Sequence, residues 1–428
     1  MSGLSDDVVV ALAEAHRREW ASVLTATVRL TRDLDLAEEC TQDAFAQALT
    51  TWSEAGIPDR PGAWLTTVAR NRARDLLRRE AVLRRKLPQL VMDDVLPVPD
   101  DDRDPAPAVA DDRLRLIFTC CHPALSREAQ VALTLRLLCG LSTGEVARVF
   151  LVQESTMAAR ITRAKRKIAT ARIPYRVPSA DELPVRLDAV LDVLHLVFTT
   201  GHTAPLGPAL VRDDLVDSAL RLGRLLHDLL PQESEATALL ALMLLTGARR
   251  GSRVSDSGGL VLLADQDRGR WDRGQITEGV GLLVGALGRR PPGRYAVQAA
   301  LAAVHAEAPS WEATDWGEVV ALYDVLRTLW PSPVVELNRA VALGMRDGPA
   351  AGLAALDPLL DEPRLATYPY LSAARADFLR RLGRPDDATA AFEEALQLTD
   401  NEVERAFLRG RIDEVQASRR DEGAAGSL

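Results

Sequence analysis

The sequence predicts an all-α protein with two small helical domains followed by a large helical extension. Apolar residues recur at helical spacing from Val8 to about Leu83, again from Asp112 to Ala171, and through the remaining Leu- and Ala-rich chain. Alternating runs of β-branched and aromatic residues, which would indicate strands, are absent from the sequence. With 428 residues, 47% of them hydrophobic, the chain is long enough to fill more than one core.

Two proline-containing segments divide the chain. The segment between Pro88 and Asp112 combines prolines with many aspartates and cannot bury a core, so we interpret it as an acidic linker. Pro174 and Pro178 interrupt the helical pattern again, because proline removes a backbone donor and clashes with the preceding turn. The predicted parts are a first helical domain at 8–83, the linker at 84–110, a second helical domain at 111–175 and the helical extension at 180–420.

Composition narrows the setting in which the protein works. No apolar run approaches the roughly 20 residues of a membrane-spanning helix, and Met1–Asp7 lacks the layout of a signal peptide, so we expect a cytoplasmic protein without a membrane partner. Four scattered cysteines are too few for a disulfide framework, and we expect them to be reduced. The net charge of -9 argues against indiscriminate nucleic-acid binding but averages over local basic patches.

A helix predicted over 61–80 has an apolar face and a basic face. The apolar face consists of Leu65, Val68, Ala69, Ala73 and Leu76. On the basic face Arg70, Arg74 and Arg78 follow one another at i, i+4 and i+8, with Asn71 beside them. Arginines in such a stripe neutralise phosphates and release counterions, so this face can bind a nucleic-acid backbone. An ordinary solvated arginine face is the alternative.

The segment from Leu141 to Arg172 has the spacing of a helix-turn-helix. Ser142 or Thr143 with Glu145 indicates a capped helix start, and Val146 and Phe150 form the buried face of that first helix. After a turn at 151–153, a second helix buries Met157, Ile161, Ala164 and Ile168. Its outer face is predicted to carry Arg160, Arg163, Lys165, Arg166 and Lys167, with Glu154, Ser155 and Thr156 at its N-terminus. In such motifs the start of the second helix reaches base edges while flanking cations bind phosphates; a plain helical hairpin is the alternative.

These segments, in this order, resemble the extracytoplasmic-function sigma factors of the sigma-70 family. The run Asp35-Leu36-Ala37-Glu38-Glu39-Cys40-Thr41-Gln42-Asp43-Ala44-Phe45 resembles their core-binding helix. Pro61-Gly62-Ala63-Trp64-Leu65 and Ala69-Arg70-Asn71-Arg72 resemble the helix that follows it. Glu145-Val146-Ala147 and Ser155 to Lys165 are similar to the helix pair that reads the minus-thirty-five element. The resemblance covers roughly residues 8–175.

The resemblance implies a role for each of these surfaces, with core RNA polymerase and promoter DNA as partners. It assigns Asp35, Glu38, Glu39, Gln42 and Asp43 to binding the clamp helices of the largest polymerase subunit. Arg70, Asn71, Arg74 and Arg78 would bind minus-ten DNA, and the loop 52–60 would capture a flipped base. Glu154, Ser155, Thr156, Arg160, Arg163, Lys165 and Arg166 would bind minus-thirty-five DNA, next to the polymerase flap. Ala158 and Ala159 replace longer side chains of the family, which leaves Glu154, Arg160 and Arg163 as the better candidates for contacts.

The C-terminal extension is similar to that of a subgroup with tetratricopeptide-like tails. Leu343-Gly344 followed by 350–360 echoes Leu382-Gly383 followed by 387–398, which indicates stacked helix pairs. Such stacks bind helices or peptides, so we expect a protein or peptide partner and a modulating role. A second motif, Asp265-Gln266-Asp267-Arg268 with Trp271-Asp272, could form a docking network; aspartate caps and a packed tryptophan are the alternative.

The sequence gives no reason to expect an enzyme, a cofactor or a metal. Cys120-Cys121-His122 is adjacent, but no second pair follows at the spacing of a structural zinc site, and the six histidines show no metalloprotease spacing. We therefore predict a sigma factor that directs transcription initiation at a specific regulon. A helical-repeat scaffold and a helix-turn-helix repressor remain as alternatives; the repressor would dimerise on a palindrome without polymerase.

Overall fold

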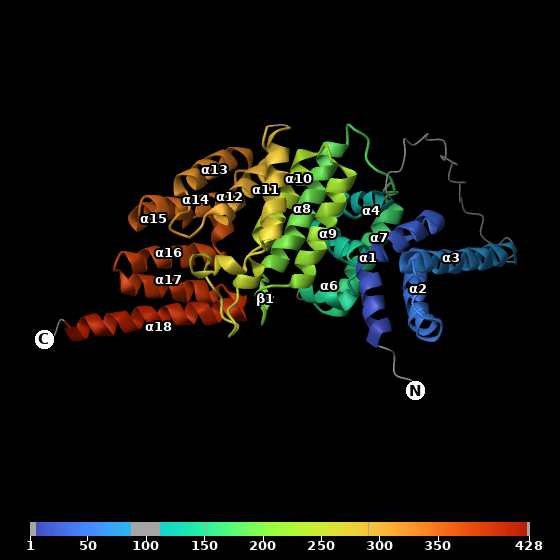
Figure 1. The fold of residues 1–428 in the computed structure, drawn as a ribbon, viewed down its shortest axis with the longest axis horizontal. Coiled ribbons are helices and arrows are strands. Elements are labelled where there is room, and N and C mark those ends of the chain that lie inside the picture. The colour runs from blue at the N-terminus through green and yellow to red at the C-terminus, as the bar shows by residue number, and fades with distance from the viewer. Residues whose placement is uncertain (1–5, 87–111, 151, 290, 426–428) are drawn as a thin grey trace. The chain divides into compact units, whose positions relative to one another are not determined.

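The computed structural model describes residues 6–86, 112–150, 152–289 and 291–425, and the all-α prediction is confirmed (Figure 1). Within these ranges the chain is helical apart from loops and two strands of two residues each. It divides into two compact units, 1–193 and 194–428. The predicted acidic linker lies almost entirely outside the described residues.

The first unit begins with three helices that pack on one another. They are α1 (Asp6–Thr31), α2 (Leu34–Ala55) and α3 (Pro61–Lys86). Trp20, Phe45, Trp52 and Leu65 lie at the centre of their shared core. The start of α2 is fixed by Asp33, whose Oδ1 accepts hydrogen bonds from the backbone N–H groups of residues 35 and 36 at 2.8 and 2.9 Å.

The predicted helix-turn-helix forms in the second half of this unit. Its helices are α4 (Asp112–Cys120), α5 (Arg127–Leu133), the π-helical turn η1 (Thr134–Leu138), α6 (Thr143–Phe150) and α7 (Glu154–Thr170). Ser142 and Glu145 form a reciprocal cap: Ser142 N–H donates to Glu145 Oε2 at 2.6 Å, and Glu145 N–H donates to Ser142 Oγ at 3.2 Å. All four predicted apolar residues of the second helix are buried, so the periodicity located α7 correctly.

The helix α8 (Leu183–His202) crosses the division between the two units. Its first half is bonded to the first unit, because Arg186 Nη2 donates to the Phe118 carbonyl at 2.5 Å and Arg127 Nη2 pairs with Asp192 Oδ2 at 2.5 Å. These two bonds explain why the first compact unit extends beyond the proline-containing segment near residue 175.

The second unit is arranged around the apolar helix α10. Its first helices are α9 (Asp213–Leu229), α10 (Ser234–Gly247), α11 (Arg273–Leu287), α12 (Arg294–Glu307) and α13 (Trp316–Leu329). Between α10 and α11 lie the short helices η2 (Arg250–Ser252), η3 (Leu263–Asp265) and η4 (Arg268–Arg270). Almost every residue of α10 is buried, and the helix contacts α9, α11 and α12. A helix that is apolar on all sides is stable only when its neighbours cover it.

Two helix pairs occupy the places of the predicted repeat. They are α14 (Pro333–Arg346) with α15 (Pro349–Leu356), and α16 (Pro369–Arg381) with α17 (Pro385–Gln397); η5 (Asp357–Leu359), η6 (Pro363–Leu365) and α18 (Glu402–Ala425) complete the chain. Gly344 and Gly352 allow α14 and α15 to approach closely, since a Cβ on either would crowd the Cα of the other, and they also leave room for the Phe378 ring of α16. In Figure 1 the helices α16, α17 and α18 lie side by side.

The sequence contained no indication of the small parallel sheet in the second unit. Its strands are β1 (Leu206–Gly207) and β2 (Asp400–Asn401). The pairing depends on Asn401, whose buried side chain donates to the Ala204 and Ala209 carbonyls at 2.9 and 3.0 Å. Strands of two residues are too short to produce an alternating pattern.

Candidate nucleic-acid and protein interfaces

The acidic face of α2 contains all five predicted polymerase-binding residues. Asp35, Glu39 and Gln42 are exposed, Asp43 is half-buried and Glu38 is buried. Gln42 Nε2 donates to Glu38 Oε1 at 3.1 Å, and Asp43 Oδ2 accepts a hydrogen bond from Arg72 Nε of α3 at 2.8 Å. The helix therefore brings these side chains together, but only part of the set is accessible.

Glu38 lies at the centre of a buried ion-pair network. Lys165 Nζ is 2.6 Å from Glu38 Oε2 and 2.7 Å from Asp35 Oδ1, and Arg136 pairs with the other oxygen of Glu38. The side chains of Lys165 and Glu38 are 8% and 7% exposed. Two cations from the helix-turn-helix half of the unit thus neutralise two of the predicted polymerase-binding carboxylates.

A second contact joins the same two halves of the first unit. Trp20 Nε1 of α1 donates to the Leu137 carbonyl of η1 at 3.1 Å. Gly140, at φ +74°, lies directly against the side chains of His16 and Trp20 and leaves no room for a Cβ. Burial is the main reason why the pKa of His16 is lowered. The neutral imidazole packs at 4.9 Å from the Trp20 ring, measured between centroids.

The basic face of α3 is open to solvent, as its predicted role requires. Arg70, Asn71, Arg74 and Arg78 are all exposed. Arg74 Nη1 donates to Asn71 Oδ1 at 3.2 Å. Beside this face lies a groove of about 460 Å³ whose walls include Asn71 and Arg72 of α3 and Asp43 of α2. The predicted DNA-binding and polymerase-binding surfaces therefore meet along one groove.

The loop predicted to capture a flipped base is exposed over residues 53–57. Its first residue, Trp52, is instead buried and packs edge-to-face against Trp64 at 5.8 Å between ring centroids. Trp52 is therefore a core residue of the three-helix domain, and its ring is not available for stacking on a base.

The prediction that Lys165 lies on the outer face of α7 with the other DNA-binding residues is wrong, because its side chain is buried. The exposed members are Glu154, Ser155, Thr156, Arg163 and Arg166. Arg160 is half-buried, and its guanidinium lies 5.5 Å from the centre of the Phe150 ring. Lys165 lies four residues after Ile161 and next to Ala164, so it is on the buried face. The helical spacing in the sequence would have been enough to predict that Lys165 is buried. It did not predict the carboxylates that pair with Lys165, or that Arg136 joins them.

The aspartate, arginine and tryptophan motif after α10 acts within the second unit. Asp272 Oδ1 accepts from the backbone N–H of Gln275 at 3.0 Å and caps α11, and this hydrogen bond lowers the pKa of Asp272. Trp271 is buried, and Arg268 donates to the His305 and Ala308 carbonyls at 2.6 and 2.8 Å. Asp272 therefore caps α11, Trp271 packs in the core, and Arg268 bonds the connection between α10 and α11 to the end of α12.

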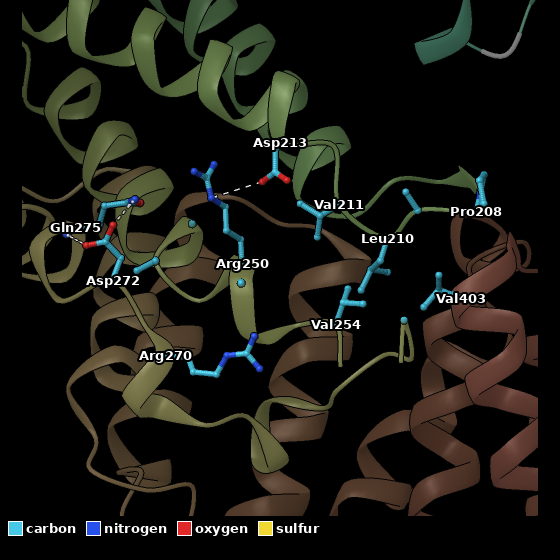
Figure 2. A pocket seen from close by; sticks show the side chains of 15 residues that line it. Pro208, Leu210, Val211, Asp213, Arg250, Val254, Arg270, Asp272, Gln275 and Val403 are labelled. Carbon is cyan, nitrogen blue, oxygen red and sulfur yellow. Dashed lines mark hydrogen bonds and ion pairs between the residues drawn. The ribbon is translucent and has the colours of Figure 1, made fainter. Parts of the chain in front are cut away.

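An open pocket of about 570 Å³ is lined in part by the same connection (Figure 2). Its two arginines have carboxylate partners: Arg250 pairs with Asp217 at 2.6 Å and with Asp213 at 3.6 Å, and Arg270 pairs with Asp256 at 3.6 Å. The pocket therefore has little uncompensated charge.

In the run Cys120-Cys121-His122, the side chains of Cys121 and His122 have local partners. Cys121 Sγ lies 3.7 Å from Thr134 Oγ1, and His122 Nδ1 accepts from the Ala124 N–H at 3.1 Å. Burial raises the pKa of Cys121 to about 12. Within the described residues no group of three or more His, Cys, Asp or Glu side chains could hold a metal ion. Nor is any described helix both long and apolar enough to span a bilayer.

Comparison with known proteins matches three segments of the chain to families. Residues 12–82 match Sigma-70 region 2, residues 115–168 match Sigma-70 region 4, and residues 186–287 match a family of unknown function, DUF6596. The protein named "Uncharacterized protein R00370" of Rhizobium meliloti (strain 1021) is 44% identical over 399 residues, which cover 92% of this chain and 93% of the relative.

The two sigma-70 segments contain the helices that carry the acidic face of α2 and the basic faces of α3 and α7. A chain with regions 2 and 4 in this order is a promoter-recognition factor of RNA polymerase. This chain belongs to the sigma-70 family. It resembles the extracytoplasmic-function type and carries an additional helical extension at its C-terminus.

Proposed function

We propose that this sigma factor directs polymerase to its own set of two-element promoters. The acidic face of α2 binds the clamp helices, the basic face of α3 binds the melted minus-ten strand, and the exposed face of α7 binds the minus-thirty-five element. The observation that carries the proposal is that both basic helices expose most of their arginines to solvent while burying apolar residues on another face. The exposed arginines include Arg70, Arg74 and Arg78 on α3 and Arg163 and Arg166 on α7. Exposed arginines can exchange water and counterions for phosphates at little cost.

Binding of polymerase then requires a change of partners at Glu38. In the packed form, Lys165 and Arg136 neutralise the carboxylate that the clamp helices would meet. A buried carboxylate cannot serve two sets of cations at once, so polymerase has to displace the helix-turn-helix half from α2. In the same step Lys165 is released toward solvent, where it can contact a phosphate.

The test is transcription in vitro from a promoter library, with core polymerase free of other sigma factors. We expect initiation at promoters with two defined elements. Arg70→Ala/Arg74→Ala and Arg160→Ala/Arg163→Ala should each reduce output at least tenfold, because each removes two cationic contacts. Two exposed arginines of α1, changed as Arg17→Ala/Arg18→Ala, provide the matched control. If neither the full chain nor a chain that ends after His202 initiated transcription, the proposal would be contradicted.

The proposed role of the C-terminal extension is to modulate this activity in the cytoplasm, through a protein or peptide partner. A chain that ends after His202 retains the bonds of Arg186 and Asp192 to the first unit and lacks the rest of the second unit. We expect its output to differ from that of the full chain at the same promoters. Equal output from the two chains would contradict a modulating role.

A further inference from the structure

We propose that the C-terminal extension contains a binding site for a small anion, in a cavity of about 50 Å³ whose walls include Arg249, Trp271 and His305. The site goes beyond promoter recognition and involves neither polymerase nor DNA. Its ligand would be an anion of chloride, nitrate or formate size, either free in solution or as the carboxylate end of a small molecule.

The cavity lies where three segments of the second unit meet. Thr246 and Arg249 come from the end of α10 and the residues after it, Trp271 from the connection that precedes α11, and His305 from the last turn of α12; four apolar side chains complete the wall. A space of about 10–15 Å³ is enough for one water, so this cavity has room for several water-sized groups.

Two residues that line the cavity each have a buried ring nitrogen without a hydrogen-bond partner among the described residues. Trp271 is 4% exposed, and its Nε1 has no acceptor. His305 Nδ1 is likewise unpartnered. Buried polar atoms of folded proteins almost always have a partner, so two such atoms in residues that line one small cavity are the observation from which we infer a ligand there.

Arg249 supplies a positive charge that no described residue neutralises. It forms no hydrogen bond or ion pair within the described part of the chain, and the charge acting on it is a second cation, Arg253. Burial is the main reason why the pKa of Arg249 is lowered, to about 10. The guanidinium is therefore still charged at neutral pH.

The neighbouring arginines differ from Arg249, because both are bonded to the protein. Arg253 donates to the His202 carbonyl and, at 3.0 Å, to Thr203 Oγ1. Arg268 donates to two carbonyls at the end of α12, where the helix dipole favours a cation. Arg249 is also close to the C-terminal end of α10, where the helix dipole favours a cation, but no carbonyl or carboxylate of the described residues is bonded to its side chain.

The hydrogen-bonding groups on the wall favour an anion over water. Arginine and tryptophan N–H groups only donate, and the Thr246 hydroxyl can donate too. His305 can present an N–H to the cavity in one of its tautomers. An anion accepts from all of these donors and offsets the charge of Arg249, whereas a neutral water offsets none of it.

The experiment measures thermal unfolding and calorimetric binding of the full chain in sodium gluconate, an anion too large for the cavity. Chloride, nitrate, formate and sulfate replace gluconate at constant ionic strength. We expect a saturable rise in Tm with the three small anions and none with sulfate. A saturable response to sulfate that equals the chloride response would overturn the size argument, and no saturable response to any small anion would overturn the site.

Three variants locate the response. Arg249→Met should raise the Tm in gluconate, since it removes an uncompensated charge, and should abolish the response to chloride. Trp271→Phe retains the ring and removes only the N–H, so chloride affinity should fall at least threefold. Arg270→Met, which changes an arginine of the neighbouring open pocket, should respond like the unchanged protein. Equal chloride affinities in Arg249→Met and the unchanged protein would overturn the proposal.

Discussion

Each unit of this sigma factor holds a cation away from bulk solvent, Lys165 buried and Arg249 half-buried, and the two differ in their partners. In the first unit, Lys165 lies within 2.7 Å of two carboxylates that are about 130 residues away in the sequence. In the second unit, Arg249 has no acidic partner among the described residues. Removing a charge from water costs several kcal/mol unless a partner compensates it. In the first unit, carboxylates of the chain compensate the charge of Lys165. In the second unit, the proposed anion compensates the charge of Arg249.

The largest effect should follow from removing the carboxylate at the centre of the first network. Glu38→Leu leaves Arg136 with the Leu141 carbonyl but no carboxylate, and leaves Lys165 with Asp35 alone, so the packed form should lose about 3–5 kcal/mol. Urea unfolding followed by tryptophan fluorescence measures the loss. Glu39→Leu changes the exposed neighbour and should stay within about 0.5 kcal/mol. If the two variants lost the same stability, the network would not hold the two halves of the first unit together.

Acid should weaken the second unit through His305. Burial, with contributions from Arg249 and Arg268, lowers the pKa of His305 from 6.5 to about 4. The unfolded chain therefore binds more protons between these two pH values, and stability should fall by about 3 kcal/mol as the pH drops from 6.5 to 4. Tm measured against pH for the unchanged protein and His305→Gln isolates this contribution. Identical profiles for the two proteins would contradict it.

Freeing Glu38 should strengthen binding to polymerase. Lys165→Met weakens the packed form and increases the fraction of molecules whose acidic face is accessible, so affinity for core polymerase should rise by about 3–10-fold. Fluorescence anisotropy with labelled sigma factor and no DNA measures this affinity directly. Lys167→Met, which alters an exposed lysine on the same helix, is the control. Weaker binding by Lys165→Met would mean that Lys165 itself supports the complex.

The smallest effect should come from an exposed ion pair of the second unit. Arg224 Nη2 lies 2.8 Å from Glu278 Oε2, with side chains 45% and 41% exposed. Solvent screens such a pair, so Arg224→Ala should cost about 0.5 kcal/mol or less, and less still in high salt. A loss above about 2 kcal/mol in a urea titration would show that burial is not what separates strong from weak pairs in this protein.

Periodicity in the sequence located the helices that carry the predicted surfaces, because each buries one regular apolar face. Met157, Ile161 and Ile168 identified α7 in this way. Periodicity could not identify the partner of a buried charge, since Glu38 and Lys165 meet only after the chain has folded. For the same reason the sequence could not predict that Arg136 pairs with Glu38. It could not predict the cavity beside Trp271 either, because the walls of that cavity come from three separate segments.

Asn401 affects the order in which the protein can fold during synthesis. Its side chain bonds Ala204 and Ala209, which are made almost 200 residues earlier. Domains fold as their last required residues leave the ribosome, and a contact of this separation can form only late. The promoter-reading helices are therefore complete and able to fold while the extension is still an unfinished chain, so nascent sigma factor passes through a period in which it has its DNA-binding helices but no finished extension.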